Sequence, residues 1–300
     1  MPSLRAPFTA SLVSLSLISF HVARGAISYS VPGSTYSENF NSLPADAPNN
    51  ASIETVYTNG WRDDTATVAG THVSLPGWYL FHPLSPAAEN GFNGNQRLRM
   101  GTGANTGAFW AFSAPDAANA DKALGTIGSN TMADPGVNMF WGLRLTNDSL
   151  VALDTFTLTF DAEQWRDGQS AAPETMTFDY SATATLADWN SPTGPFTAVP
   201  SLSFTSPVFT GVAAAGTALD GNLAANRTAD LTATITGISW APGTDLWLRW
   251  ADANLAAFAD DGLAIDNVRF VANFTIPEPA GPGLLGLGAV TLLGVRRRRR

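Results

Sequence analysis

The chain contains no cysteine, which excludes disulfide bonds and thiolate chemistry. It has only three histidines, and the two beyond the N-terminal segment, His72 and His82, are too few for a zinc site. A G-x-S-x-G motif is absent, and the Gly-rich GTGANTG at 101–107 lacks the Lys of a phosphate-binding loop. The common zinc, nucleophile and nucleotide chemistries therefore have no support in the sequence.

Charged residues are scarce and unevenly placed. They make up 14% of the 300 residues, and all 25 acidic residues lie between Glu38 and Glu278. Seven of the 16 basic residues lie at the two ends, so the middle holds nine basic against 25 acidic residues, a charge of −16. Such a body repels phosphate backbones, and we expect no nucleic-acid partner.

Residues 1–25 have the three parts of a secretory signal peptide. Arg5 supplies a positive charge, FTASLVSLSLISF at 8–20 is uncharged, and Ala23-Arg24-Gly25 offers small side chains on either side of Arg24, as at a cleavage site. A buried N-terminal helix is the alternative, but the apolar stretch is rich in Ser and has no polar face. We therefore expect a signal helix and export through the Sec translocon.

The C-terminal end also has three parts. Pro277-Glu278-Pro279 is rigid and non-helical, because each Pro fixes φ and removes a backbone donor. The stretch 283–295 is uncharged but short for a bilayer span, and five arginines follow it: Arg296, Arg297, Arg298, Arg299 and Arg300. Arginines that reach the lipid headgroups make up such a deficit, and the positive-inside rule keeps them in the cytoplasm. A polybasic nucleic-acid tail, the alternative, explains neither the apolar stretch nor the signal peptide.

These three elements together resemble the sorting signal of PEP-CTERM proteins of Gram-negative bacteria, over residues 275–300. The resemblance implies that an exosortase, a membrane-embedded transpeptidase-like protease, recognises Pro277, Glu278 and Pro279. A short transmembrane helix would hold the chain transiently in the inner membrane, with Arg296 to Arg300 as the stop-transfer signal. Cleavage near the motif would then leave the product at the cell surface or in extracellular polysaccharide.

Between the two ends, apolar and polar residues alternate with a period of two. LDTFTLTF at 153–160 places two Phe and one Leu on one face and three Thr on the other. The same alternation recurs at 175–180, 231–235 and 245–250, and Pro- and Gly-rich breaks separate the segments. This pattern is typical of half-buried strands in an antiparallel sandwich.

No change in composition divides the body, and no repeat of fixed period is present. No window of more than ten residues has helical periodicity there. We therefore expect one all-β domain over residues 26–274, with long loops near 41–60 and 113–136. The expected fold is a single antiparallel jelly-roll-like β-sandwich between the signal helix and the short C-terminal transmembrane helix.

The two ends of this domain carry a second resemblance. SENFNSLP at 37–44 and DDGLAIDNVRF at 260–270 are similar to the first and last strands of MAM-like and carbohydrate-binding jelly rolls. In those folds an acidic-aromatic N-terminal strand lies near a C-terminal strand of the type A-I-D-[DN]-V. The resemblance supports the fold more than an activity.

If these two strands are adjacent, several oxygen ligands converge, as Ca²⁺ requires: Glu38, Asn39, Asp260, Asp261 and Asp266. Asp266 also falls on the apolar face of its strand, where an acid needs a partner or a β-bulge. The alternative is that Asp266 accepts backbone hydrogen bonds or pairs with an Arg, while Asp260 and Asp261 form a solvated turn. Structural calcium is the only cofactor that these residues predict.

The segment FDAEQWRDG at 160–168 holds a second acidic group, Asp161, Glu163 and Asp167, around Trp165. A glycosidase needs two carboxylates across a cleft, and Asp161 and Glu163 share a face of a strand. The signature of laminarinase-like sandwiches, with two Glu and an Asp at fixed spacing, is absent. The alternative is a strand that runs into a turn, with Trp165 in the core.

Nine tryptophans favour sugar binding, because aromatic faces stack on the apolar faces of pyranose rings. Five of them lie in or beside expected loops: Trp61, Trp78, Trp110, Trp141 and Trp189. Any single Trp in a large β-sandwich is nevertheless more often part of the core or its rim than of a binding site.

The sequence therefore predicts an exported, non-enzymatic protein of the cell surface or extracellular matrix, with a structural or adhesive role in exopolysaccharide. The alternative is a carbohydrate-binding module with a specific sugar site, and a glycoside hydrolase is the third hypothesis. The expected partners are an exosortase, the Sec translocon and extracellular polysaccharide.

Overall fold

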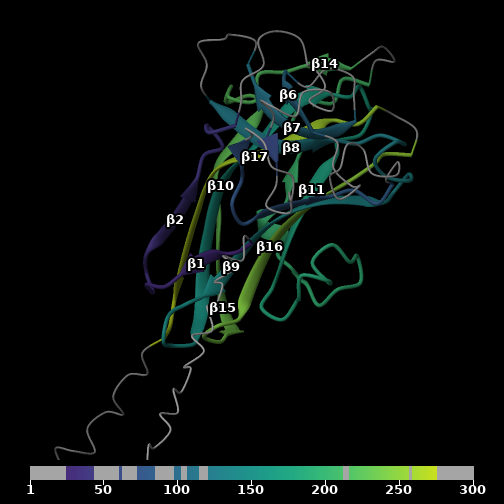
Figure 1. The fold of residues 1–300 in the computed structure, drawn as a ribbon. Helices are drawn as coiled ribbons and strands as arrows, with labels where there is room; N and C mark the ends of the chain where they lie inside the picture. Colours follow the sequence, from purple (N-terminus) through teal and green to yellow (C-terminus); the bar gives the residue numbers. More distant parts are fainter. Residues whose placement is uncertain are drawn as a thin grey trace, which may run out of the picture.

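The computed structural model describes the body of the chain in eight segments: residues 25–43, 61–62, 73–84, 98–102, 107–114, 121–211, 216–256 and 259–275. The expected signal helix, PEP motif, transmembrane segment and arginine cluster lie outside these residues. The described segments contain no α-helix, and hence no helix that could span a bilayer. They consist of β-strands and their connections (Figure 1).

The first sheet has seven strands and is built around β9 and β16. Its order is β1-β9-β16-β11-β12, and β5 also pairs with β9 and β13 with β11. The strand bounds are β1 Ile27–Tyr29, β5 Trp78–Phe81, β9 Asn138–Asn147, β11 Thr175–Ser181, β12 Thr197–Ala198, β13 Phe204–Thr205 and β16 Asp245–Ala253. A short 3-10 helix, Pro200–Leu202, joins β12 to β13.

The second sheet has eight strands and is built around β10 and β17. Its order is β14-β10-β17-β8-β7-β6, and β15 also pairs with β10 and β2 with β17. The strand bounds are β2 Thr35–Glu38, β6 Leu98–Gly101, β7 Ala108–Ser113, β8 Lys122–Ile127, β10 Leu153–Asp167, β14 Thr217–Ala218, β15 Arg227–Trp240 and β17 Gly262–Asn273. Two further short strands, β3 Trp61–Arg62 and β4 Val73–Ser74, pair only with each other.

The two sheets pack face to face around an aromatic core. Trp250 of β16 meets Phe160 of β10 edge to face, with ring centroids 5.5 Å apart, so the contact joins the two sheets. Phe178 of β11 packs edge to face on the same Trp250 at 5.1 Å. Large aromatic side chains bury the most apolar area per residue, which makes this layer the main stabilising contact of the sandwich.

The expected alternation is confirmed where one face of a strand is buried. Phe156, Leu158 and Phe160 of β10 are buried, while the intervening threonines are half-exposed. The loop expected over 113–136 is wrong, because β8 lies within it. Every residue of β8 is buried, so its sequence KALGTI has no alternation by which it could be found.

The antiparallel expectation holds for most strand pairs but not for all. β1 runs parallel to β9, β6 runs parallel to β7, and β3 runs parallel to β4. Figure 1 shows the N-terminal strands β1 and β2 beside β9 and β17, which lie far from them in the sequence. The first segment of the domain thus contributes one strand to each sheet.

Candidate functional site

The expected adjacency of the first and last strands is confirmed, and it coincides with an irregularity in β17. One edge of β17 pairs with β10 along its length, while the other edge pairs first with β8 and then with β2. Ile265 is opposite Leu124 of β8, and Val268 is opposite Glu38 of β2. The two residues between them, Asp266 and Asn267, lie where β17 changes its neighbour.

A β-bulge occupies this position, which is one of the two arrangements expected for an acid on the apolar face of LAIDNVRF. The pairing of β10 with β17 shifts by one residue between Thr159 and Asp161, and Asn267 has a φ of 51°. Ile265 and Val268, three residues apart, consequently both enter the core between the sheets. Asp266 points to the opposite, outer face of the eight-stranded sheet.

On that outer face, five carboxyl groups from β2, β10, β17 and the residue before β8 lie close enough to act on one another electrostatically, and we call them the outer acid group: Glu38, Asp121, Asp161, Glu163 and Asp266. Asp161 is well supplied with donors, because its Oδ1 accepts the Asp230 N–H at 2.7 Å and its Oδ2 accepts the Asn267 amide at 3.1 Å. Arg227 approaches the same carboxylate at 3.8 Å. Asp161 therefore has a mainly structural environment.

Glu163 and Asp266 are less well supplied, although both are buried. Glu163 Oε2 accepts a hydrogen bond from Trp165 Nε1 at 2.8 Å. Its Oε1 and the Oδ1 of Asp266 find no hydrogen-bond donor in the described part of the chain. Two buried carboxylate oxygens thus lack the partners that buried polar atoms normally have.

The pKa values of these two carboxyls follow from that environment. Burial raises the pKa of Asp266 to about 8, and the negative charges of Asp121, Asp161 and Glu38 add to the rise, which the Asn267 N–H opposes. Burial, together with the charge of Asp266, holds the pKa of Glu163 well above its usual range. The outer acid group therefore favours binding of a proton or another cation.

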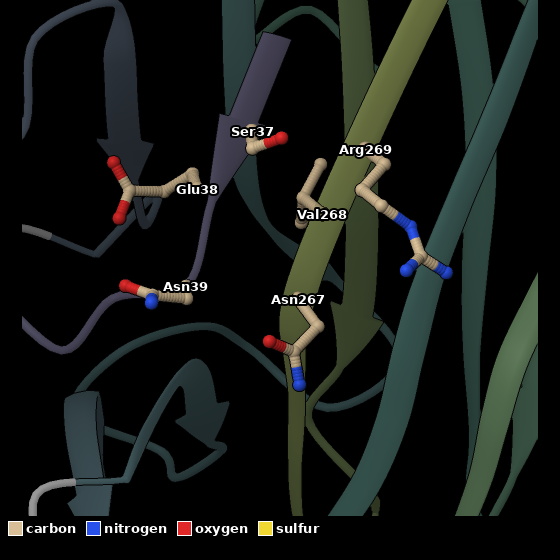
Figure 2. A pocket seen from close by; sticks show the side chains of 6 residues that line it. All are labelled: Ser37, Glu38, Asn39, Asn267, Val268 and Arg269. Atoms are coloured by element: carbon tan, nitrogen blue, oxygen red, sulfur yellow. The ribbon is translucent and has the colours of Figure 1, made fainter. Parts of the chain in front are cut away.

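A polar pocket of about 340 Å³ opens between β2 and β17 beside this group. Its lining residues are Ser37, Glu38, Asn39, Asn267, Val268 and Arg269. Figure 2 shows Asn39 and Asn267 on either side of the space between the two strands, while Arg269 points away from it. The guanidinium of Arg269 instead meets the carboxylate of Asp230.

Glu38 is held at the rim of this pocket by the turn that ends β2. Its Oε1 accepts the N–H of Phe40 at 2.7 Å, and Phe40 itself has a φ of 51°. Burial raises the pKa of Glu38, and the N–H groups of Phe40 and Asn39 oppose that rise. The pocket thus presents one carboxylate, two amides and a hydroxyl, which are groups that bind sugar hydroxyls or a cation.

The five residues of the predicted calcium site fall into two separate groups, which corrects the expectation that they converge. Glu38, Asn39 and Asp266 lie at the bulge. Asp260 and Asp261 precede Gly262, which pairs with Ile127 and Arg166, about 20 Å along the strand from Val268. Among the described residues, no three His, Asp or Glu side chains are gathered as a metal-holding group.

Asp260 and Asp261 belong to a second cluster, between the two sheets, that the sequence did not predict. We call it the inter-sheet acid group: Glu174, Asp252, Asp260 and Asp261. Along β16, Leu246, Leu248 and Trp250 enter the core, and Asp252 is next in the same alternating row. That row was the available signal, because an acid in an inward position of a strand must be buried.

Hydrogen bonds place these carboxyls precisely within the sandwich. Thr126 of β8 donates to Asp252 Oδ2 at 2.5 Å, and the N–H of Asp261 donates to Glu174 Oε2 at 2.7 Å. Glu174 and Asp252 are neighbours on the inner face, because the register of β11 on β16 places them diagonally across from each other. Asp260 Oδ1 accepts the Leu255 N–H at 2.5 Å.

Burial is the largest cause of the raised pKa values in this group. It raises the pKa of Asp252 to about 7, with the Thr126 hydroxyl opposing the rise, and the pKa of Asp260 to about 6, with the Leu255 N–H opposing. The pKa of Glu174 stands well above its usual range, because burial and the charge of Asp252 both disfavour its ionised form. Burial also raises the pKa of Asp261.

The tryptophans expected to present sugar-binding faces are buried, so that prediction is wrong wherever the structure describes them. Trp78, Trp110 and Trp141 have no exposed surface, and Trp189 is 6% exposed. Trp189 stacks on Trp247 with ring centroids 5.5 Å apart. The side chain of Trp61 lies outside the described residues.

The segment FDAEQWRDG continues β10 to Asp167 and then turns. Trp165 is fully buried and stacks on Phe112 with centroids 5.7 Å apart, as the structural alternative predicted. Asp167 closes the turn, since its Oδ1 accepts the Gln169 N–H at 2.7 Å and its Oδ2 accepts the Thr210 hydroxyl at 2.6 Å. This local bonding gives Asp167 a structural position rather than one beside a substrate.

No protein-family model matches the chain, and no curated protein matches it. The chain is similar to the CBM22-1 xylan-binding domain of Paenibacillus barcinonensis Xyn10C, at 10% identity over 83% of this chain and 100% of that one, with a TM-score of 0.33. The chain is also similar to the K1 cleaved adhesin domain of Lys-gingipain from Porphyromonas gingivalis W83, at 14% identity over 80% of this chain and 99% of that one, with a TM-score of 0.30.

The mannan-recognising carbohydrate-binding module TmCBM27 gives 11% identity, covering 65% of this chain and 88% of that one, with a TM-score of 0.30. Likeness at this level carries no argument about what this chain binds. The assignment to an all-β, two-sheet fold rests instead on the strands of the chain itself.

Proposed function

We propose that this protein is an exported, non-catalytic component of the cell surface or extracellular matrix that attaches to polysaccharide through the pocket between β2 and β17. The observation that carries this proposal is the polar lining of the pocket, which combines a carboxylate, two amides and a hydroxyl. Such groups match the alternating donors and acceptors of a sugar ring. A volume of about 340 Å³ is at the small end of ligand sites and suits one or two sugar units.

The route to the surface is part of the same proposal. The signal peptide expected at residues 1–25 would begin export through the Sec translocon, and an exosortase would process the chain near Pro277, Glu278 and Pro279. The arginines at 296–300 would stop transfer in the inner membrane. The support for this route is the order of the three C-terminal elements in the sequence.

A calcium ion near Glu38, Asn39 and Asp266 stays a prediction. Its support is the buried, unpartnered Oδ1 of Asp266 beside the carboxyl groups of the outer acid group. Oxygen ligands of this kind are those that Ca²⁺ prefers. Calcium at this position would fix the bulge of β17 and so hold Asn267 at the pocket.

Binding of the mature protein to a glycan array, followed by calorimetry with the best ligand, tests the proposed attachment. Asn267→Gly keeps the positive φ of the bulge but removes an amide from the pocket, so we expect binding about tenfold weaker, the loss of one hydrogen bond. Asn273→Ala, at an exposed position of the same strand, is the matched control and should bind normally. Equal binding by all three proteins would place the sugar elsewhere.

A further inference from the structure

Asp252 ties the two sheets together at one end of the sandwich. It has no exposed surface, it lies on β16 of the seven-stranded sheet, and its Oδ2 accepts the hydroxyl of Thr126 from β8 of the eight-stranded sheet. The next inward residue of β16 after Trp250 is the carboxyl itself, whereas the cross-strand neighbours of the two bonded residues, Met139 beside Asp252 and Phe109 beside Thr126, belong to the core. A polar contact between the sheets thus lies beside apolar side chains of the core.

Glu174, which lies just before β11, completes this connection. It is 3% exposed, and its Oε2 accepts the N–H of Asp261. The register of β11 on β16, with Thr177 opposite Ala251, places Glu174 diagonally across from Asp252 on the same face of the sheet. The other two oxygens, Asp252 Oδ1 and Glu174 Oε1, have no donor among the described residues. Since an ionised carboxylate only accepts hydrogen bonds, a bond between two carboxyls requires one proton.

The charged groups around Asp252 and Glu174 do not remove the need for this proton. Asp260 and Asp261, from the segment before β17, add negative charge, and so does Asp167 at the end of β10 near Asp261. Arg166 of β10 is the facing cation, and its guanidinium donates to the backbone oxygen of Asp260. The group as a whole holds four carboxyls against this one cation, and such crowding favours proton binding.

We propose that Asp252 and Glu174 share one proton at neutral pH and thereby form a pH-sensitive contact between the two sheets. In this state one carboxyl donates to the other, while Thr126 and the N–H of Asp261 satisfy the outer oxygens. Loss of the proton leaves two buried carboxylates facing each other, which weakens the contact between the sheets at this end.

The direction of the pH effect follows from where the proton is bound. Burial raises the pKa of Asp252 to about 7, whereas in an unfolded chain an Asp titrates near 3.9. Between these two values the folded state holds a proton that the unfolded state has lost. Stability from this pair is therefore fully present below about pH 4 and is lost as the pH rises through about 7.

Thermal unfolding between about pH 5 and pH 9 tests the proposal on the wild type and on Asp252→Asn and Glu174→Gln. In Asp252→Asn the amide oxygen can still accept the Thr126 hydroxyl while the amide nitrogen donates to Glu174, so no proton is needed. We expect the wild-type melting temperature to fall by several degrees over this range. Either variant should lose a substantial part of that fall and exceed the wild type at the alkaline end.

Asp148→Asn, at an exposed position of the turn after β9, controls for the removal of one negative charge and should follow the wild-type curve. Infrared spectra near neutral pH give a second measurement, because the neutral-carboxyl band of the wild type should be reduced in Asp252→Asn. If neither variant folds, the absence of this band from the wild type would still overturn the proposal. The part of the band that disappears in Asp266→Asn and Glu163→Gln belongs to the outer acid group, and the proposal requires a remainder.

Two results would overturn the shared proton directly. The first is a set of parallel pH curves for the wild type and both variants. The second is a rise in the wild-type melting temperature with Ca²⁺ at alkaline pH that both Asp252→Asn and Glu174→Gln abolish, because a bound cation would then occupy the place of the proton.

Discussion

The outer faces of the two sheets carry buried ionisable side chains: Arg249 on the seven-stranded sheet, and Glu163 and Asp266 on the eight-stranded sheet. Arg249 donates to both oxygens of Asp179 at 2.8 and 2.7 Å and to the carbonyl oxygens of Trp189 and Ser191 at 2.8 Å each. Glu163 and Asp266 each keep one oxygen without a donor in the described residues. The buried guanidinium of Arg249 is thus fully supplied with partners, whereas these two carboxyls are not.

The reason for this difference lies in what covers each face. The connection between β11 and β12 folds over the seven-stranded sheet, and the guanidinium of Arg249 lies 3.5 Å from the ring centroid of Phe196 and 4.4 Å from that of Phe140. On the eight-stranded sheet, Glu163 receives one hydrogen bond, from the indole N–H of Trp165 on its own strand. A buried charge with a full set of partners is structural, whereas an incomplete set indicates a place for a ligand.

Arg249→Ala removes the buried guanidinium and should cause the largest loss of stability. It would leave Asp179 and two carbonyl oxygens without their donor, and we expect a loss of about 3–5 kcal/mol in the free energy of unfolding, measured by urea titration. Arg249→Lys keeps the charge but cannot form the two-pronged bond, so it should lose less. A loss below about 1 kcal/mol would show that Arg249 behaves as a surface ion pair.

A bound calcium ion would supply the partner that Glu163 Oε1 and Asp266 Oδ1 of the outer acid group lack among the described residues. If it binds near Asp266, the wild type should be stabilised by about 2.7 kcal/mol at a hundredfold excess over the dissociation constant, seen as a higher melting temperature. Asp266→Asn should abolish the response, whereas Asp134→Asn, at an exposed turn, should retain it. An unchanged wild-type melting temperature in millimolar Ca²⁺ would end the calcium prediction.

The smallest change in stability is expected for exposed polar side chains of the eight-stranded sheet. Thr157 of β10 and Thr234 of β15 face each other with hydroxyl oxygens 2.8 Å apart at the surface. Replacing both by Val should change the free energy of unfolding by less than about 0.5 kcal/mol in a urea titration, because water replaces the bond and Val suits a strand. If this double variant lost as much free energy of unfolding as Arg249→Ala, burial would not explain the difference in stability between buried and exposed polar groups.

The alternating segments could be found from the sequence because one face of each strand is buried. The alternation of Phe156, Leu158 and Phe160 predicted β10. The position of Asp266 among apolar residues indicated a partner or a bulge, and the structure has a bulge there. β8 could not be found in this way, since both of its faces are covered. Trp78, Trp110 and Trp141 were assigned to loops for a similar reason, because both faces of β5, β7 and β9 are buried around them and leave no period to detect.

The candidate site was predicted only in part. The chain order suggested that Glu38 meets Asp266, but it also suggested that Asp260 and Asp261 join them. Strand geometry separates the two pairs, because each residue of an extended strand advances the chain by about 3.3 Å. Glu174 was missed altogether, since it lies in a connection whose position depends on the rest of the fold.

The sequence by itself determined the composition of the body, the alternation that makes it a β-sandwich, and the motifs at its two ends, because these depend on local patterns of polarity. The tertiary structure decided which carboxyl groups meet, which tryptophans are covered and where a pocket remains. Those outcomes depend on strand order and register, which bring together residues such as Thr126 and Asp252 that no local pattern connects.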